Sequence, residues 1–397
     1  MKFGLFFELS VPRPWTAGSD RRVYELALEQ VKLADELGFD QMWTVEHHFL
    51  EEYSHSSAPE LWLTSVACHT ENIRIGHGVC TLLPAYNHPV RSAERAAWLD
   101  IISNGRLEFG TGRSTTWTEL GGFGINPDET KEMWSDCLAA IPKMWTQEHF
   151  SWDSPYLRLP PRNVVPKPLQ KPHPPLWVAC SSPETTVQAA ERGIGMLGVS
   201  VGTPKEQEGR IAEYHRLIQS CEPVGDFVNE QANALNFLYV DEDRERGRFI
   251  GERLIAQFNR QATQTVGINQ VYPGSAYNTP GLLFALRRDS MAKGKALIKD
   301  GFAIGDPDDV ISAIRQWEAT GVDGVMFLVN NSQIIPQELV LNSLRLFAQH
   351  VMPAFRTNLN IARPRPVEHP DGRDGDGDGA AARQAEPAAV GAAREGR

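Results

Sequence analysis

The sequence is poor in cysteine. Only five of its 397 residues are Cys, and they are scattered, with no CxxC pair, at Cys68, Cys80, Cys137, Cys180 and Cys221. This pattern argues against a disulfide framework or a zinc site and favours reduced thiols, as in a cytoplasmic protein. We therefore expect no metal centre.

Positive charge and long apolar runs are also scarce. The chain has 39 Lys and Arg against 50 Asp and Glu, a formal net charge of -11. We do not expect an acidic protein of this kind to bind nucleic acid or an anionic membrane over a broad surface. No run of 18 apolar residues is present, so we expect no transmembrane helix, and MKFGLFFEL at the start lacks a signal-peptide pattern. A cytoplasmic location is the resulting expectation.

Large apolar residues nearly disappear after residue 358. The segment from 359 to 397 is rich in Gly, Ala, Pro and charged residues. It cannot bury enough apolar surface to offset the entropy lost on ordering. The DGDGDG stretch within it resembles the start of a calcium loop, but Ala385 stands where the bidentate Glu is needed. We predict one folded domain over residues 1–358 and a disordered tail over 359–397.

The first 358 residues contain short apolar runs that alternate with helical patterns. The runs predict eight strands, at 2–9, 40–46, 72–83, 106–112, 176–181, 195–200, 234–240 and 324–329. Most are apolar throughout, as expected of parallel strands covered on both faces. Eight such units favour an α/β fold of the (β/α)8 TIM barrel type, with an open doubly wound sheet as the alternative. The long segments 148–175 and 241–305 predict insertions after strands 4 and 7.

Polar residues collect where the second predicted strand ends. In a parallel barrel the carboxyl ends of the strands meet at the mouth, where active sites lie. Glu46, His47 and His48 stand at this position. Because adjacent strand residues face opposite ways, we do not expect both histidines to enter one site, which argues against a metal pair. A histidine here is either a structural hydrogen-bonding group or a catalytic one.

Three other strand ends suit a ligand that carries a phosphate. The fourth strand ends in GTGRS, where glycine lets backbone approach a ligand and Arg113 can contact an anion. The fifth ends in CSSPET, where Ser181 or Ser182 can cap the next helix, and a capped N-terminus binds phosphate readily. In the third, Gly78 allows a flat ring to lie against the backbone, or else marks a β-bulge. Together these features predict a flat cofactor with a phosphate.

Seven motifs follow one another along most of residues 1–355. They are KFGLFFE, ELGFDQMWTVEHHF, NIRIGHGVCTLLP, HPVRSAERAAWLDIISNGRLEFGTGRS, FGINPDE, PLWVACSSPET and IGDPDDVISAIRQWEATGVDGVMFLV. In this order they resemble the bacterial luciferase-like family of flavin monooxygenases. The resemblance implies a (β/α)8 barrel, often dimeric, that takes reduced FMN from a separate flavin reductase. It also implies that O2 forms a C4a-hydroperoxyflavin, which oxidises a small organic substrate.

The resemblance assigns roles to individual residues. His47, the first His of EHHF, would lie beside the flavin and assist its oxygen chemistry as a hydrogen-bonding or acid–base group, which suits the pKa of an imidazole. Gly78 and Val79 would form a non-prolyl cis peptide under the ring. The residues placed around the flavin phosphate would be Arg113, Lys131, Cys180, Ser181 and Ser182. His77 points either into the barrel or into the helical layer.

Two alternative functions remain open at this stage. One is an oxidoreductase of the same barrel family that uses the deazaflavin F420 and moves hydride without oxygen. The other is a non-catalytic flavin-binding partner subunit, against which the presence of His47 argues. Gly112 replaces the reactive cysteine of luciferase, which weakens any expectation of light emission. We predict a two-component, FMN-dependent monooxygenase that forms a homodimer, with helices near 58–70 and 88–105 as a possible dimer face.

Overall fold

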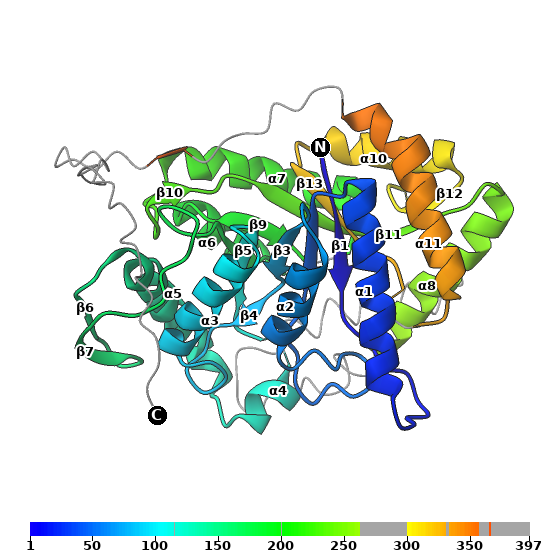
Figure 1. Cartoon of the computed structure of the whole chain (residues 1–397). Coiled ribbons are helices and arrows are strands. Elements are labelled where there is room, and N and C mark those ends of the chain that lie inside the picture. The colour runs from blue at the N-terminus through cyan, green and yellow to red at the C-terminus, as the bar shows by residue number, and fades with distance from the viewer. Residues whose placement is uncertain (115, 200, 263–299, 331–332, 357–364, 367–397) are drawn as a thin grey trace, which may run out of the picture.

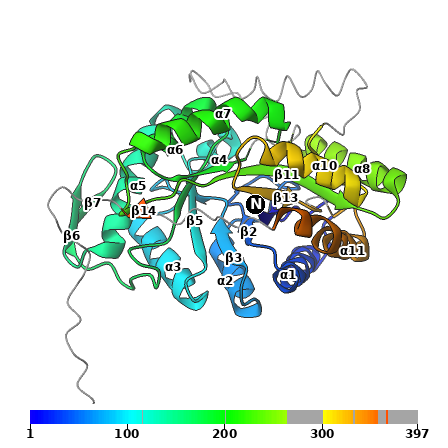
Figure 2. The ribbon, with the colours of Figure 1, turned by 90° about the horizontal axis from the view of Figure 1, so that it is seen from above.

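Eight parallel strands form a closed barrel surrounded by helices (Figures 1 and 2). The computed structural model describes residues 1–114, 116–199, 201–262, 300–330, 333–356 and 365–366. Along the barrel the strands follow the order β13-β1-β2-β3-β5-β8-β9-β11, and β11 pairs with both β9 and β13. This pairing closes the ring, so the predicted TIM barrel is confirmed and the open sheet is excluded.

All eight barrel strands coincide with predicted apolar runs. They are β1 (Lys2–Phe7), β2 (Gln41–Thr44), β3 (Arg74–His77), β5 (Leu107–Gly112), β8 (Leu176–Ala179), β9 (Gly195–Gly198), β11 (Ala232–Val240) and β13 (Gly324–Leu328). Two short strands extend the sheet, β4 (Cys80–Thr81) beside β5 and β12 (Ala303–Gly305) beside the end of β11. Nearly every strand residue is buried, because side chains fill the barrel on one face and helices cover the other.

The helical layer consists of α1 (Ser19–Leu37), α2 (Pro59–His69), α3 (Pro89–Ile102), α4 (Trp117–Gly122), α5 (Thr130–Thr146), α6 (Pro183–Glu191), α7 (Pro204–Leu217), α8 (Arg244–Ala262), α10 (Pro307–Glu318) and α11 (Gln337–Leu346). Short turns of other helix types are η1 (Pro127–Glu129), η2 (Ile218–Ser220), η5 (Phe347–Val351) and η6 (Met352–Phe355). Proline occupies the first position of several helices, where its missing N–H is not needed. None of the described helices is both long and apolar enough to span a membrane.

The two predicted insertions differ in what they contain. Residues 148–175 carry an antiparallel hairpin of β6 (Phe150–Asp153) and β7 (Arg158–Arg162), which lies beside α5 (Figure 1). Residues 241–305 contain α8 and β12, while 263–299 lie outside the described residues. The predicted disordered tail over 359–397 also lies outside them, apart from β14 (Arg365–Pro366), which pairs with β10 (Phe227–Val228). The tail therefore remains a prediction.

Two tryptophans fill the middle of the barrel. The ring of Trp43 on β2 packs edge-on against Trp177 on β8, with ring centroids 5.3 Å apart. A Cβ atom on Gly76 would overlap the Trp43 ring, so only glycine leaves room for this tryptophan. The barrel is thus a packed core that closes the interior below the carboxyl ends of the strands.

Candidate active site at the barrel mouth

His47 lies between two buried carboxylates. It follows β2, and its Nδ1 is 3.0 Å from Oε1 of Glu119, while its Nε2 is 3.8 Å from Oε2 of Glu8. Glu8 follows β1, and Glu119 belongs to α4, which lies on the side toward which β1 points in Figure 1. The imidazole is therefore at the barrel mouth with one acid facing each ring nitrogen.

Glu119 is fixed by a dense set of donors. Its Oε2 accepts hydrogen bonds from the hydroxyls of Thr116 (2.6 Å) and Ser114 (2.9 Å), and Oε1 accepts one from the backbone N–H of His48 (3.0 Å). Burial by itself raises the pKa of Glu119, but the charge of His47 and these hydrogen bonds lower it below its usual range. Glu119 is therefore ionised at neutral pH and holds the imidazole in one orientation.

Glu8 is the less satisfied acid. The Tyr53 hydroxyl donates to its Oε1 over 3.0 Å, whereas Oε2 is buried without a hydrogen-bond partner. Burial raises the pKa of Glu8, against the lowering effects of His47 and Tyr53. A buried carboxyl oxygen without a partner is destabilising, so the arrangement suits a site where a bound molecule supplies the missing donor.

The two acids determine the protonation state of His47. Burial lowers the pKa of the imidazole, but Glu119 first, then Glu8 and Glu46, raise it to about 9. His47 is therefore an imidazolium at neutral pH, with a proton on each ring nitrogen. One proton is directed to Glu119 and the other faces the mouth near Glu8.

The side chain of His48 lies outside this cluster, although its backbone N–H donates to Glu119. Its Nε2 is 3.2 Å from Oε1 of Glu46, and its ring packs against Tyr86 and Phe123. The prediction that the two adjacent histidines enter different environments is confirmed. Among the residues that the structure describes, no group of three or more His, Cys, Asp or Glu is arranged to hold a metal ion.

Gly78 and Val79 form a wall of the mouth. The peptide bond between them is cis, as the resemblance implies, and the N–H of Gly78 donates to the carbonyl of Thr44 over 2.7 Å. A Cβ atom on Gly78 would lie 2.9 Å from the Phe6 ring, so a side chain does not fit there. His77, one residue earlier, packs against Phe109 at 5.8 Å between ring centroids, and burial lowers its pKa.

The outward position of His77 follows from the strand geometry. Gly76 contacts Trp43 inside the barrel, and neighbouring residues of a strand face opposite sides. Phe109, the contact of His77, packs against Trp145 of α5 in the helical layer. The structure therefore resolves the open choice for His77 in favour of the helical layer.

Two predicted phosphate-contacting residues, Arg113 and Lys131, come together near the N-terminus of α6. Arg113 follows β5 and donates to the Thr130 hydroxyl over 3.3 Å at the start of α5. Lys131 forms an ion pair with Glu184 in the first turn of α6. Lys131 first, and then Arg113, lower the pKa of Glu184, so both cations lie close to that helix N-terminus. An anion at this point would meet two positive side chains and the dipole of α6, and would compete with the Glu184 carboxylate for Lys131.

The turn before α6 contributes backbone rather than reactive side chains. Ser182 is the N-cap, and its Oγ accepts from the N–H of Thr185 over 3.3 Å. The Cys180 sulfur is buried 3.5 Å from the carbonyl of Val178, and burial raises the pKa of its thiol to about 12. Cys180 therefore stays a protonated thiol, and only its backbone contributes to the turn next to Ser181.

Ser114 joins the two halves of the site. It stands one residue after Arg113 and donates its hydroxyl to Glu119, the partner of His47. All parts of the candidate site follow the carboxyl ends of β1, β2, β3, β5 and β8, which face one side of a parallel barrel. These parts are His47 with its two acids, the peptide of Gly78 and Val79, and the N-terminus of α6 with Arg113 and Lys131. The sequence predicts His47 as a site residue but not its two acid partners, Glu8 and Glu119, and the assignment of the phosphate-contacting residues stays a prediction.

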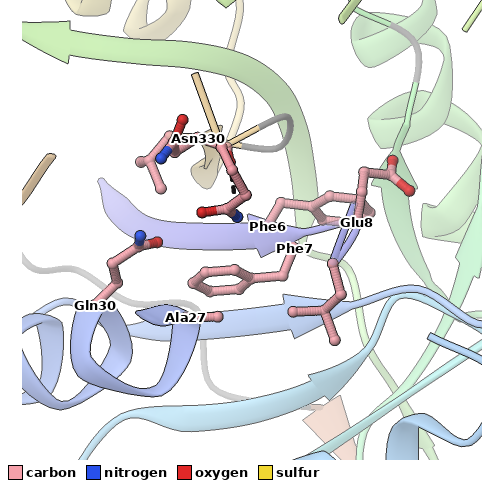
Figure 3. Close-up of a pocket in the computed structure, with 9 residues that line it drawn as sticks. Phe6, Phe7, Glu8, Ala27, Gln30 and Asn330 are labelled. Carbon is pink, nitrogen blue, oxygen red and sulfur yellow. Dashed lines mark hydrogen bonds between the residues drawn. The ribbon is translucent and has the colours of Figure 1, made fainter. Parts of the chain in front are cut away.

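A small hollow lies at the carboxyl end of β1. It is lined by residues of β1 and the segment after it, of α1 and of the segment after β13, namely Phe6, Phe7, Glu8, Leu9, Ala27, Gln30, Val329, Asn330 and Gln333. Figure 3 shows Phe7 on the same side of β1 as Ala27 and Gln30, and the Glu8 carboxyl directed away from them. Glu8 lines this hollow and also faces His47, so it is shared by the hollow and the cluster around His47.

Two characterised relatives are similar over most of their length. The oxygenase component of flavin-dependent trigonelline monooxygenase from Acinetobacter baylyi is 24% identical over 89% of this chain and 96% of its own. Limonene 1,2-monooxygenase from Rhodococcus erythropolis is 27% identical over 84% of this chain and 81% of its own.

Solved structures share the same barrel. The monooxygenase RslO1 from Streptomyces bottropensis superposes with a TM-score of 0.72 at 27% identity, covering 89% of this chain and all of its own. Two others are similar in fold. The oxygenating constituent of 3,6-diketocamphane monooxygenase from Pseudomonas putida, in complex with FMN, has a TM-score of 0.69 at 19% identity over 89% and 98% of the two chains. The F420-dependent tetrahydromethanopterin reductase from Methanopyrus kandleri has a TM-score of 0.62 at 18% identity over 89% and 99%.

The sequence model of one protein family covers most of the chain. It matches residues 1–324, which include seven of the eight barrel strands in full and all the residues gathered at the mouth. This protein therefore belongs to the luciferase-like monooxygenase family.

Proposed function

We propose that this protein is the oxygenase component of a two-component monooxygenase, which uses reduced FMN and O2 to oxidise a small organic substrate. The observation that carries the proposal is the placement of His47 between Glu8 and Glu119, at a mouth that also gathers cations beside a capped helix. A separate flavin reductase would supply the reduced flavin, as the name "oxygenase component" of the trigonelline relative suggests. The free state of all five cysteines accords with a cytoplasmic protein.

The residues at the mouth fit a flavin with its phosphate. Arg113, Lys131 and the backbone of residues 180–182 would hold the phosphate at the N-terminus of α6. The cis peptide between Gly78 and Val79 would lie under the flat ring, as the family resemblance implies. When bound, reduced flavin would supply the activation of O2, which the family resemblance implies to proceed through a C4a-hydroperoxyflavin.

The protein's own contribution is a fixed, charged proton donor. Glu119 holds Nδ1–H of His47, so Nε2–H points into the mouth, where it can donate to an oxygen atom of the reacting group. The Oε2 atom of Glu8 lies near this proton and can accept it or stabilise the charged imidazolium. The packed tryptophans below the mouth exclude water from the barrel interior.

Proteins with this fold use either FMN or F420, and the two cofactors imply different reactions. FMN is bound in one structural neighbour and F420 is used by another. A charged histidine close to the ring favours the oxygen-activating use of FMN, because oxygen chemistry requires proton delivery to a developing anion. An oxidoreductase that moves hydride with F420 is the second candidate, favoured only by the shared barrel.

Purified protein tests the proposal directly. Photoreduced FMN is bound anaerobically, O2 is added by rapid mixing, and coupled oxidation is followed with a panel of carbonyl and terpenoid-like substrates. We expect His47→Ala to bind flavin within about twofold of wild type but to lose coupled oxidation by about 10²-fold or more. His215→Ala, an exposed histidine on α7, is the matched control. Tight binding of F420 with no response to O2, or full activity of His47→Ala, would refute the proposal.

We also propose that the protein is a homodimer through the outer faces of α2 and α3. Large apolar side chains are exposed there, with Leu61 72% and Trp98 56% accessible, together with Ile101 and Ile102. An exposed apolar patch of this kind is typical of a protein interface.

A further inference from the structure

Arg210 contacts the turn before α6 from the side of α7. Its Nη2 lies 3.1 Å from the carbonyl of Cys180, 3.3 Å from that of Ser182 and 2.9 Å from the hydroxyl of Thr186. Its Nη1 donates to Oε1 of Gln207 over 3.1 Å. One guanidinium thus holds both carbonyls that flank Ser181.

These hydrogen bonds fix the direction in which the turn presents its N–H groups. A trans peptide is planar, and its C=O and N–H point in opposite directions. When Arg210 holds the Cys180 carbonyl, the N–H of Ser181 is turned to the side away from α7. The Ser182 carbonyl is also held at the N-cap, where α6 begins, but the next residue is Pro183, which has no N–H, so this contact steadies the turn without directing a donor. Arg210 therefore keeps the Ser181 N–H aimed away from itself.

The charge of Arg210 has no carboxylate partner among the described residues. Its hydrogen-bond acceptors are two carbonyls, a hydroxyl and an amide oxygen, and its Nε is buried without an acceptor. A partly buried cation without a counter-charge is unfavourable unless an anion binds nearby. The helix N-terminus that Arg210 supports also attracts anions, so both features call for the same ligand.

We propose that Arg210 is a positioning residue for the phosphate of the flavin, because it holds the residue 180–182 turn in its anion-binding shape and adds positive charge behind it. This inference rests on the proposed function. Arg210 would not touch the phosphate, unlike Arg113 and Lys131. Its loss is therefore expected to weaken the binding of flavins that carry a phosphate and to leave binding of the ring unchanged.

The test compares FMN with riboflavin, which lacks the phosphate. Dissociation constants are measured by quenching of flavin fluorescence on the full chain of wild type, Arg210→Met and Arg210→Lys. We expect wild type to prefer FMN at least tenfold. Arg210→Met should weaken FMN binding about tenfold, or about 1.4 kcal/mol, while riboflavin binding changes less than twofold. Arg210→Lys keeps the charge but not the planar fork, and should fall between the two.

Two controls separate this role from a merely structural one. Arg216→Met removes an exposed arginine of the same helix that pairs with Glu213, and should change neither constant. Gln207→Ala removes one acceptor of Arg210 and should lower the FMN preference slightly without affecting the fold. If Arg210→Met does not fold, as judged by circular dichroism, the Arg210→Lys and Gln207→Ala results decide the matter.

The outcomes distinguish this inference from the proposed function. If folded Arg210 variants keep the wild-type preference for FMN, the positioning role is wrong while the flavin phosphate site stands. If wild type itself binds FMN and riboflavin equally, the phosphate site at α6 is wrong, and this inference is wrong with it. A selective loss of FMN binding in Arg210→Met, absent from Arg216→Met, supports the role.

Discussion

Nδ1 of His47 lies 3.0 Å from Oε1 of Glu119, a carboxylate 72 positions further along the chain. The hydroxyls of Ser114 and Thr116 and the N–H of His48 bind the same carboxylate, so its position is over-determined. A partner this firmly held makes the imidazole a fixed proton donor rather than a mobile one. The chemistry proposed for the mouth therefore depends on a residue that neither follows a barrel strand nor lies near His47 in sequence.

Replacing Glu119 by Gln is expected to shift the pH dependence of activity. Gln keeps the size of the side chain but removes the charge that contributes most to raising the pKa of His47. If protonated His47 is required, wild-type activity falls as pH rises through about 9, and this alkaline limb moves to lower pH in Glu119→Gln. Near pH 8 we expect kcat/KM to fall about 10- to 100-fold.

The measurement is kcat/KM for coupled substrate oxidation between pH 6 and 10. Glu213→Gln, which removes an exposed carboxylate on α7, serves as the control and should keep the wild-type profile. An unchanged alkaline limb in Glu119→Gln would show that the charge of Glu119 does not govern the active proton.

His47 is also expected to make folding stability depend on pH. Its pKa is raised from 6.5 to about 9 in the folded protein, so the folded state binds the proton more tightly than the unfolded one. The resulting stabilisation is fully present below about pH 6.5 and is lost as pH rises through about 9, by about 1–3 kcal/mol. His47→Gln cannot bind this proton and should show a flatter decline.

Urea denaturation at pH 6.5, 8 and 9.5 measures this difference. The quantity to compare is the change in the free energy of unfolding across the window, wild type minus His47→Gln, which cancels the contributions of groups distant from His47. Parallel curves for the two proteins would mean that His47 is not charged in the folded state.

The fold could be read from the sequence because the barrel strands are apolar on both faces. Most of the eight runs have this character, and the glycines and prolines around them mark helix ends. The hairpin β6–β7 was missed, since its second strand, Arg158–Arg162, contains two prolines and is mostly exposed. Such an edge strand carries little of the periodic signal on which strand prediction depends.

Residues of the candidate site could be predicted from the sequence only where they stand at the end of a barrel strand. The strand-end rule that selected His47 applies equally to Glu8, the polar residue that ends KFGLFFE, so Glu8 was within reach of the same argument. Glu119 and Arg210 were not. Both stand on helices, in patterns that look like solvated faces, and only the tertiary fold brings them to His47 and to the turn at 180–182.

Gly76→Ala is expected to be strongly destabilising. A Cβ atom at this position would overlap the ring of Trp43, and the surrounding barrel is closely packed. Overpacking of this kind usually destabilises by about 1–3 kcal/mol. Because the clash involves one ring, the double variant Gly76→Ala with Trp43→Phe should recover part of the loss.

Thermal and urea unfolding of the single and double variants check this expectation. Gly209→Ala on α7 is the matched control, because nothing lies within 4 Å of the added atom and alanine favours the helix. It should be neutral or stabilising by up to about 1 kcal/mol. If Gly76→Ala is as stable as wild type, the packing of Trp43 against that strand is wrong.

The proposed dimer face predicts that acidic substitutions on α2 or α3 separate the subunits. Leu61→Glu or Trp98→Glu places a charge on the exposed apolar patch, and burying an unpaired carboxylate in an interface is unfavourable by several kcal/mol. Phe249→Glu on α8 is the control, since Phe249 is 60% exposed and lies on a different helix. Light scattering after gel filtration should give a dimer for wild type and Phe249→Glu, and a monomer for the other two variants. A wild-type monomer, or dimers that survive both substitutions, would place the subunit contact elsewhere or remove it.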